Sequence, residues 1–445
     1  MAHINVLGAG LAGCEAAWTA ASMGVDVTLY EMKPVKFTPA HHDPNFAERV
    51  CSNSLRSDRV TVASGLLKSE LERFGSLIMQ AARATQVAAG SALAVDRDKF
   101  SAYITVKIRS HPRITVIEKE VTEIPQDGIT VVATGPLTSD AMADHIVTAL
   151  GCDGLHFFDA VAPIVDAESI NYDVAYFASR YDKGDADYIN CPMDREQYDA
   201  FYNALVSAEE AQLKEFDRDF QKELKVFEGC MPVEVMAKRG YDTLRYGPLK
   251  PVGLVDSRTG KESYAVVQLS RENEEGTMYN LVGFQTHLTF PEQKRVFSMI
   301  PGLENAQFLR YGVMHRNTYL PSPELLAADY SMKSRPEVFF AGQMTGVEGY
   351  IESTGSGFVA GLNAARRALG LDSIIFPVTT MIGAMAHYIS HGGTGDFVPM
   401  NANFGLVPPL DRKVKGGKVA RYEVVAQRAA DDMTEFARIS GLELK

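Results

Sequence analysis

The sequence has no long uninterrupted hydrophobic run, although 46% of its 445 residues are hydrophobic. A membrane-spanning helix needs about 20 consecutive apolar residues, so we expect none here. The first residues carry no basic leader, and we expect the apolar segment there to belong to the fold rather than to a secretion signal. A charged content of 22% is typical of a soluble globular protein. These features predict a cytoplasmic protein without a membrane segment.

Cysteine is scarce, and its spacing excludes two further classes of protein. No CxxC pair occurs, and no spacing typical of metal ligands. A sparse, odd set of thiols is typical of reduced cytoplasmic proteins, so we predict neither a disulfide framework nor a metal site. His41 and His42 are consecutive and are interpreted as loop residues. The cysteines are Cys14, Cys51, Cys152, Cys191 and Cys230.

Positive charge is in deficit, with a formal net charge of −12. Because cationic side chains drive phosphate binding, this balance alone argues against a nucleic-acid partner. Two local clusters qualify that argument, although a solvated basic face is an equally good interpretation of each. The first contains Lys238, Arg239, Arg245 and Lys250, and the second contains Arg412, Lys413, Lys415, Lys418 and Arg421.

The first strong motif is HINVLGAGLAG at residues 3–13, followed by a small-residue segment. It predicts a strand, a glycine turn and a helix, and a second apolar run ends in Glu31. This is the βαβ dinucleotide fingerprint: Gly8 makes the turn, Gly10 lets backbone approach a pyrophosphate, and Gly13 lets the helix lie close to the strand. The N-terminus of a helix favours binding of a phosphate group. The carboxylate of Glu31 can accept hydrogen bonds from the ribose hydroxyls. The predicted contacts are Gly8, Ala9, Gly10, Leu11, Ala12, Gly13 and Glu31.

Two later segments have the pattern of strands that return to the same sheet. GITVVATGP at 128–136 is an apolar strand ending in glycine, and EVFFAG at 337–342 is another. A glycine-rich stretch follows the second strand, and STGSG at 353–357 is predicted to begin a helix whose N–H groups face the cofactor. Flavoproteins of this architecture place such strands beside FAD. The predicted contacts are Ala133, Thr134, Gly135, Gly342, Gln343, Gly355, Ser356 and Gly357.

The chain is long for one core, so two domains are expected. We predict an α/β, Rossmann-like FAD-binding domain of the glutathione-reductase type, formed by residues 1–160 and 331–445. An α+β insertion domain at 161–330 interrupts it. Further predictions are an extended loop after Glu31, helices at 63–82, 96–110, 194–209 and 212–225, a strand at 114–118 and a hairpin within 263–289 that turns at Glu272–Gly276.

A set of longer motifs runs through the whole chain in order. They are GAGLAGCEAA, ERVCSNSLRSD, ALAVDRDKF, VVATGPLTS, DKGDADYINCPM, FEGCMPVEVMAKRG, TLRYGPLKPVGL, YGVMHRNTYL, FAGQMTGVEGYIES and MNANFGL. Together they resemble the folate- and FAD-dependent tRNA (uracil-5-)-methyltransferases, which make ribothymidine in the T-loop. The departure at STGSG, where SAASG is expected, keeps the small residues. The chain lacks the long C-terminal extension of the related FAD enzyme that modifies the wobble uridine.

The resemblance assigns roles to two thiols. From the residues alone, a buried structural cysteine is the favoured interpretation of Cys230, although Lys238 and Arg239 follow it and could make it reactive. Its FEGCMP motif resembles the family's, which implies that Cys230 adds to C6 of the uracil. Cys51 is implied to be the second catalytic thiol, either as general base or as a stabiliser of the flavin-bound methylene. Which thiol acts first stays open.

The resemblance also implies the co-substrates: FAD, 5,10-methylenetetrahydrofolate as donor, and NADH or NADPH as reductant. His315 is a candidate for stacking on folate, with a hydrogen-bonded interior histidine as the alternative. The implied partner is the T-loop of tRNA, contacted by the two basic clusters, and the sequence indicates no stable protein partner. Two alternatives remain: the same chemistry on ribosomal RNA, and a plain NAD(P)H–flavin oxidoreductase without an RNA substrate.

Overall fold

The computed structural model describes residues 2–38, 40–151, 155–160, 162–182, 185–211, 231–256, 258–273, 276–312, 314–392, 397 and 399–445. Side chains are described for these residues except 155–160, 182 and 314–318. Cys152, Cys230 and the helix predicted over 212–225 lie outside the described residues.

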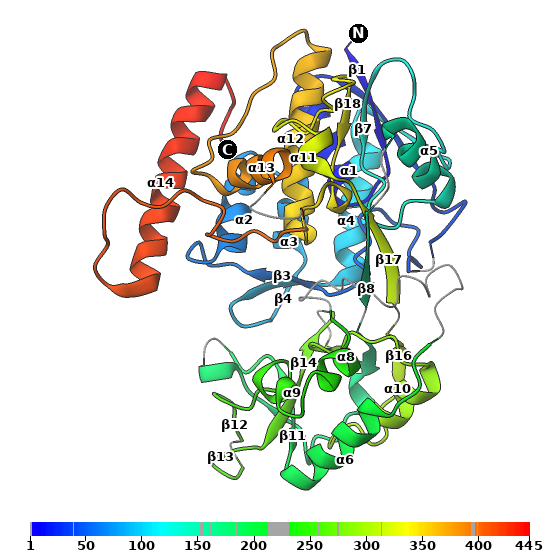
Figure 1. Ribbon diagram of the computed structural model, residues 1–445, viewed down its shortest axis with the longest axis vertical. Helices are drawn as coiled ribbons and strands as arrows, with labels where there is room; N and C mark the ends of the chain where they lie inside the picture. Colours follow the sequence, from blue (N-terminus) through cyan, green and yellow to red (C-terminus); the bar gives the residue numbers. More distant parts are fainter. Residues whose placement is uncertain are drawn as a thin grey trace.

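A parallel sheet organises the upper half of the molecule in Figure 1. All of its described strands pair in parallel. The strands at 129–132 and 338–340 are almost wholly buried, as their apolar runs predict, whereas the strand at 114–118 is largely exposed. The order of its strands is β18 (Val338–Phe340), β7 (Ile129–Val132), β1 (His3–Leu7), β2 (Asp26–Glu31) and β6 (Ile114–Glu118). The predicted α/β, Rossmann-like fold class is therefore confirmed. The two strands predicted to return to this sheet, β7 and β18, lie together on one side of β1.

Two helices pack closely against each other on this sheet. These are α1 (Leu11–Ser22) and α12 (Tyr350–Ala368). A Cβ placed on Gly357 would lie 2.2 Å from the backbone oxygen of Ala12, so only glycine permits this approach. The prediction that 353–357 begins a helix is wrong, because α12 begins at Tyr350 after Gly349, whose φ is 121°. The small residues of that segment instead let the two helices meet.

Two further helices were predicted in this half, over 63–82 and 96–110, and the first needs a correction. The helix predicted over 63–82 is broken at Gly75, whose φ is 69°, and Ser76 then caps the second piece by accepting from the N–H of Met79. Asp96 caps its helix as predicted, accepting from the N–H of Lys99 at 3.0 Å. The helices are α2 (Ala63–Arg73), α3 (Leu77–Ala84), α4 (Arg97–Ser110), α5 (Asp140–Leu150), α11 (Ser322–Leu325) and α13 (Met381–His391). A small sheet has the order β3 (Ser54–Ser57), β5 (Ala92–Val95), β4 (Gln86–Val87).

An antiparallel sheet with its own hydrophobic core forms the lower half in Figure 1. The predicted hairpin is confirmed as β14 pairing with β15, and the predicted helix over 194–209 is α6. The strand order is β10 (Tyr176–Phe177), β11 (Ile189–Met193), β14 (Ala265–Arg271), β15 (Met278–Leu281), β9 (Ile164–Asp166) and β16 (Phe308–Arg310). The accompanying elements are α6 (Arg195–Val206), α8 (Val233–Lys238), α9 (Thr243–Tyr246), α10 (Phe290–Phe297) and the pair β12 (Val255–Asp256) and β13 (Lys261–Glu262).

A two-stranded ribbon runs between the two halves (Figure 1). It consists of β8 (Leu155–Ala160) and β17 (Met314–Tyr319), which pair in antiparallel fashion from Leu155–Tyr319 to Ala160–Met314. Ala162 already belongs to the second core, and Leu320 belongs to the first. The domain boundaries at residues 160 and 330 remain predictions.

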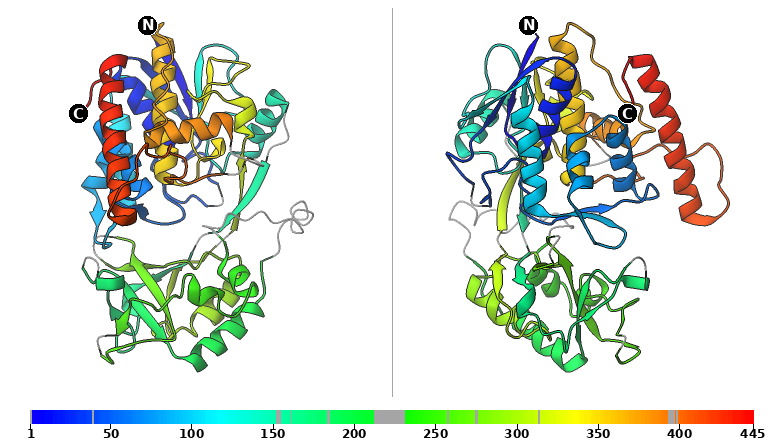
Figure 2. Two further views of the ribbon diagram at one scale, coloured as in Figure 1. Left: turned by 60° about the vertical axis from the view of Figure 1, so that its left-hand side comes forward. Right: turned by 180° about the vertical axis from the view of Figure 1, so that it is seen from behind.

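The longest described helix, α14 (Gly417–Ser440), lies along the outer side of the first half, as both views in Figure 2 show. It carries many charged residues, and its buried residues form one stripe that includes Ala429 and Met433. Among the described residues, no helix is long and apolar enough to cross a bilayer. In the same part of the chain, no group of three or more histidine, cysteine or acidic residues is arranged to hold a metal ion.

Candidate dinucleotide-cofactor site

A cavity of about 370 Å³ opens at the carboxyl edge of the parallel sheet. This is the edge at which open α/β sheets bind ligands. Eleven of the predicted cofactor contacts line it: Gly8, Ala9, Gly10, Leu11, Ala12, Glu31, Ala133, Thr134, Gly135, Gly342 and Gln343. We call the backbone of 8–12, 133–135 and 342–343 the glycine wall. Gly13, Gly355, Ser356 and Gly357 are not among the lining residues.

Each glycine of the first turn meets a different steric demand. Gly8 has a φ of 97°, and a Cβ there would lie 2.6 Å from the carbonyl oxygen of Ala133. On Gly13, a Cβ would lie 1.8 Å from the carbonyl oxygen of Gly8, so this position sets how closely α1 approaches β1. Around Gly10, by contrast, no protein atom lies within 4 Å of the Cβ position. The space at Gly10 opens toward the cavity, as a close approach of a pyrophosphate requires.

The small residues of α12 support the glycine wall from behind. The Ser356 hydroxyl accepts a hydrogen bond from the N–H of Gly342 at 2.7 Å and donates to the carbonyl of Ser353 at 2.7 Å. Gly357 lies against Ala12. Gly355, Ser356 and Gly357 were predicted to contact the cofactor directly, but they do not line the cavity. Ser356 instead holds the backbone of Gly342 in place.

Glu31 lies at the end of β2, where its carboxylate is buried. One oxygen accepts from the N–H of Ala9 at 2.8 Å and the other from the N–H of Lys33 at 2.9 Å. Each carboxylate oxygen can accept a second hydrogen bond, which leaves capacity for ribose hydroxyls. The N-terminus of α1 has no side-chain cap, and the first residues of α12 also line the cavity. Two helix N-termini, an acidic residue and the space at Gly10 fit a dinucleotide cofactor.

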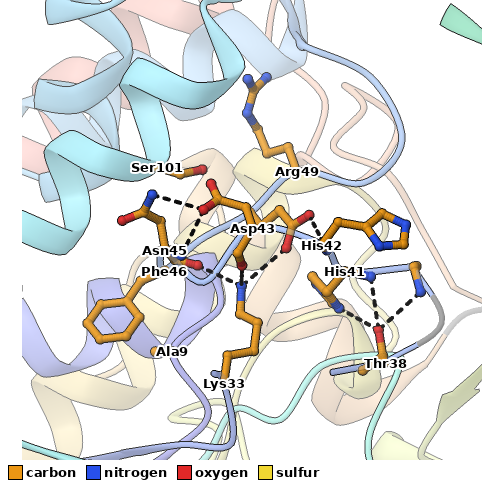
Figure 3. Close-up of polar contacts among 12 residues, drawn as sticks. Ala9, Lys33, Thr38, His41, His42, Asp43, Asn45, Phe46, Arg49 and Ser101 are labelled. Carbon is orange, nitrogen blue, oxygen red and sulfur yellow. Dashed lines mark hydrogen bonds and ion pairs between the residues drawn. The ribbon is translucent and has the colours of Figure 1, made fainter. Parts of the chain in front are cut away.

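Residues of the segments 32–38 and 40–56 also line the cavity, and we call these two segments the loop wall. Lys33 ties this segment together, as Figure 3 shows. Its ammonium group donates to the carbonyls of Asp43 at 2.8 Å and Asn45 at 2.6 Å, and it forms an ion pair with Glu48 at 3.2 Å. The N–H of Ala47 donates to the carbonyl of Ala9, which joins the loop wall to the glycine wall. Sequence reasoning missed Lys33, because no spacing reveals contacts made inside an irregular loop.

The two consecutive histidines belong to this loop, as predicted. Nδ1 of His41 lies 2.6 Å from the Thr38 hydroxyl, and His41 lines the cavity. The backbone N–H of His42 donates to Glu48 at 2.8 Å (Figure 3). These contacts help close the loop onto Glu48.

Cys51 lines the cavity from the loop wall and is half-buried. Its N–H donates to the hydroxyl of Tyr350, the first residue of α12, at 2.8 Å. Cys230 lies outside the described residues, but the chain that follows it is described. Three residues on, the N–H of Val233 donates to the carbonyl of Gln285 at 2.7 Å, and Gln285 lines the same cavity. The second half of the molecule thus contributes to the cavity through Gln285, a residue that sequence reasoning did not single out.

The remaining described cysteines, Cys14 and Cys191, are interior residues. Burial raises the pKa of the Cys14 thiol well above its usual range, and its Sγ donates to the carbonyl of Ala9 at 3.3 Å. Burial likewise raises the pKa of Cys191 to about 12. Neither thiol lines the cavity. His315 lies on β17 opposite Asp159, but its side chain is outside the described residues, so its folate contact stays a prediction.

The two basic clusters differ in how their charges are balanced. In the first, Lys238 pairs with Glu210, and Arg245 pairs with Asp242 at 2.6 Å. The second cluster precedes and begins α14, and its cations are exposed. Within the described part of the chain, Arg412, Lys413, Lys415 and Lys418 make no ion pair. Lys418 lies over the ring of Tyr422, which stacks on Phe404 with ring centres 4.2 Å apart.

The parallel sheet, the glycine turn and the cavity at the sheet's edge define a dinucleotide-binding α/β protein with an inserted antiparallel half. The model of the family "Glucose inhibited division protein A" (GIDA) matches residues 3–372. Among solved structures, Aquifex aeolicus GidA is similar, with a TM-score of 0.70 at 17% identity, covering 98% of this chain and 73% of that one. This likeness concerns the fold.

Curated relatives are much closer in sequence. Three of them are named methylenetetrahydrofolate–tRNA-(uracil-5-)-methyltransferase TrmFO. The one from Ligilactobacillus salivarius is 57% identical over 439 residues, which is 99% of both chains. Those from Acetivibrio thermocellus and Halalkalibacterium halodurans are 58% and 56% identical, covering 98% of this chain and 98% and 99% of theirs. The chain therefore belongs to the TrmFO family within GIDA, which confirms the resemblance drawn from its motifs.

Proposed function

We propose that this chain binds FAD in the cavity and methylates C5 of the T-loop uridine in tRNA. The carbon comes from 5,10-methylenetetrahydrofolate and the reducing equivalents from NADH or NADPH. The reaction agrees with the names of the curated relatives. The observation that carries the proposal is that Cys51 and Gln285, from the two halves of the molecule, line one cavity with the glycine turn. A base presented between the halves would reach a cofactor held there.

The glycine wall and Glu31 would hold the cofactor. Glu31 would accept hydrogen bonds from the ribose, and the N-terminus of α1 with Gly10 would receive the pyrophosphate. Bound there, FAD supplies the hydride chemistry that reduces the transferred carbon to a methyl group. The protein's task is to orient the reactants and to exclude water at this edge.

The thiols would activate the base. C5 of uracil is a poor nucleophile, and addition of a thiolate to C6 makes it reactive. We assign this addition to Cys230, whose neighbour Val233 is hydrogen-bonded to the cavity-lining residue Gln285. Cys51 would then accept the proton that leaves C5, after which the C6–S bond breaks and Cys230 is regenerated. His315 would stack on the folate.

Cationic side chains would contact the RNA, and the target base would leave its stack to reach the cavity. The cluster at 412–418 is exposed and unpaired among the described residues, so it is available to phosphates. Lys238, Arg239, Arg245 and Lys250 would form a second contact. Lys238 and Arg245 already pair with carboxylates, which reduces what they would contribute to RNA affinity.

A direct assay tests the activity. Purified protein is examined for the visible absorbance of bound FAD. It is then incubated with labelled 5,10-methylenetetrahydrofolate, NADPH or NADH, and an unmodified tRNA transcript. We expect label in 5-methyluridine of the T-loop. A transcript with the T-loop uridine replaced by cytidine is the matched control, and ribosomal RNA fragments form a second arm. Label only in ribosomal RNA, or NAD(P)H oxidation without label in any RNA, would contradict the proposal.

Variants test the two thiols. Replacing Cys230 or Cys51 with serine should lower the methylation rate by at least about a hundredfold, as expected for loss of a nucleophile or a general base. Cys191→Ala is the control, because Cys191 is buried away from the cavity. Full activity of Cys230→Ser would refute its assignment as nucleophile.

A further inference from the structure

The peptide groups of Cys51 are held by side chains from three separate elements. Its N–H donates to Tyr350 on α12. Its carbonyl accepts from Nη2 of Arg97, the first residue of α4, at 3.4 Å, and from Nη2 of Arg310, the last residue of β16, at 3.3 Å. Arg310 belongs to the antiparallel half, so the position of Cys51 depends on both halves of the molecule.

One buried carboxylate of the antiparallel half pairs with Arg97 across the junction. Oε2 of Glu272, which follows β14, lies 2.7 Å from Nη2 and 3.0 Å from Nε of Arg97. The two side chains are only 1% and 13% exposed, so this ion pair is shielded from water. Nearby, Asn53 donates to the carbonyl of Arg271, a second link between the loop wall and the antiparallel half.

Positive charge exceeds negative charge around this carbonyl. Arg97 also donates to the carbonyl of Arg49. The guanidinium of Arg49 is fully buried, and its Nε and Nη2 have no hydrogen-bond partner among the described residues. Burial, and then the charge of Arg97, lower the pKa of Arg49 to about 9 and that of Arg310 to about 10. Nε of Arg310 is also buried without a partner. Glu272 thus pairs directly with Arg97 and acts electrostatically on Arg49 and Arg310 at longer range.

This excess of positive charge favours a nearby anion, and the Cys51 thiol becomes an anion when it loses its proton. A sulfur lies within a few ångströms of its own carbonyl oxygen, so guanidinium groups on that oxygen are close enough to stabilise a thiolate. Tyr350 also faces Cys51, and burial, with the charge of Cys51 next, raises the pKa of Tyr350. Its hydroxyl therefore stays neutral and cannot compete for the positive charge. The carboxylates of Glu48, Glu348 and Glu352 line the same cavity as Cys51.

We propose that Arg97 and Arg310 hold Cys51 as a thiolate at neutral pH, and that Glu272 fixes Arg97 so that this state forms only when the two halves are docked. Arg97 and Arg310 are positioning residues that act through Cys51. The chemical use of the thiolate, acceptance of the C5 proton, rests on the proposed function, whereas its formation does not. An ionised thiol accepts a proton without assistance, so the site is ready before RNA arrives.

Alkylation of the reduced protein with iodoacetamide between pH 5 and 10 tests the proposal. Modification of the peptide that contains Cys51 is followed by mass spectrometry, because the alkylation rate follows the thiolate fraction. We expect a midpoint below the ordinary thiol value of about 8.5. Arg310→Met should raise the midpoint by about one unit, so that the rate at pH 6 falls about tenfold while the rate at pH 10 changes less than twofold. Arg310→Lys should restore most of the shift.

Arg295→Met is the matched control. It removes one cation from the same half of the molecule, where Arg295 forms an exposed pair with Glu292 on α10, and it should leave the midpoint unchanged. Cys14 and Cys191 report folding, because buried thiols react slowly only while the protein is folded. If Arg310→Met exposes them, Arg310→Gln takes its place in the same assay.

A wild-type midpoint at or above 8.5 would overturn the proposal, as would an unchanged midpoint in a folded Arg310 variant. Neither readout uses RNA or folate. A protein that fails to methylate RNA but shows a lowered Cys51 midpoint refutes the proposed function alone, and the reverse result refutes this inference alone.

Discussion

The two walls of the cavity are built by different means. In the glycine wall, the shape comes from backbone: Gly8 takes a positive φ, Gly13 touches Gly8, and Gly10 leaves open space. In the loop wall, long side chains hold an irregular segment in place, with Lys33 at one end and the arginines around Cys51 at the other.

This difference separates what is fixed locally from what is fixed at long range. The glycine wall needs residues within a short stretch of strand, turn and helix, together with two neighbouring strand ends. The loop wall needs partners from α4, α12 and β16, which are far apart along the chain. Substitutions in the glycine wall should therefore act through steric clashes, and substitutions in the loop wall should act through lost charge and lost hydrogen bonds.

The largest effect is expected at Gly13, where the backbone of Gly8 leaves no space for a side chain. Gly13→Val places side-chain atoms where the backbone of Gly8 lies, so we expect destabilisation above about 4 kcal/mol and loss of bound cofactor. Gly10→Ala is the paired variant: its Cβ meets no protein atom, so the protein should melt normally but retain less FAD. Thermal melts and visible absorbance measure both. Equal effects of the two substitutions would show that the steric account is wrong.

The next effect is expected at Lys33 in the loop wall. Lys33→Met leaves Glu48 and two carbonyls without their buried cation and should lower the free energy of unfolding by about 3 kcal/mol. Urea denaturation measures the loss, and limited proteolysis should show cleavage near Asp43. Lys36→Met removes a half-exposed lysine paired with Glu120 and should cost less than about 0.5 kcal/mol. Indistinguishable costs would mean that Lys33 does not organise the loop wall.

A pH-dependent effect is expected in the antiparallel half. His287 lies between Glu210, at 2.8 Å from Nε2, and Glu234, at 2.6 Å from Nδ1. Burial lowers the pKa of His287, but these carboxylates outweigh it and raise the pKa to about 9. Because the pKa of His287 is raised in the folded protein, the protonated imidazole stabilises the fold fully below pH 6.5, and this stabilisation is lost as the pH rises toward 9.

Replacement of His287 therefore gives a defined pH signature. His287→Asn should cost about 2 to 3 kcal/mol at pH 6, and the difference from wild type should shrink as the pH approaches 9. Urea denaturation at several pH values measures it. A difference that stays constant with pH would indicate lost packing instead of a lost charge.

The smallest effect is expected for RNA binding by exposed lysines. Replacing Lys413, Lys415 and Lys418 with alanine removes three unpaired cations and should weaken tRNA binding about tenfold, or about 1.4 kcal/mol. The slope of log affinity against log salt should fall by about two. Lys238→Ala, whose cation already faces Glu210, should change affinity less than threefold. Filter binding at several salt concentrations separates the two clusters, and a larger effect of Lys238→Ala would reverse their assignment.

The sequence was sufficient for the parallel sheet and the glycine wall, because their determinants are contiguous. Glu31 was placed correctly for the same reason, since its position at the end of β2 follows from the strand alone. The error at 353–357 arose because small residues serve helix starts and helix contacts alike. The signal for the true start was Gly349, which precedes the helix with a positive φ.

The loop wall could not be predicted in the same way. Arg97 begins a helix and Arg310 ends a strand, and neither position carries a pattern that links it to Cys51. Their meeting depends on how the two halves dock, which no local spacing encodes. Gln285 is hidden for the same reason, because it lines the cavity from a loop of the antiparallel half.

The ribbon of β8 and β17 has a consequence for how this architecture can vary. Because Leu155 pairs with Tyr319, the chain leaves the first half and returns to it at a single point. Closing residues 156–318 with a short turn would leave every strand of the parallel sheet in place. The antiparallel half is therefore a replaceable module in topological terms, whereas its exchange would remove Arg310 from the carbonyl of Cys51 and Gln285 from the cavity, and would leave the glycine wall in place.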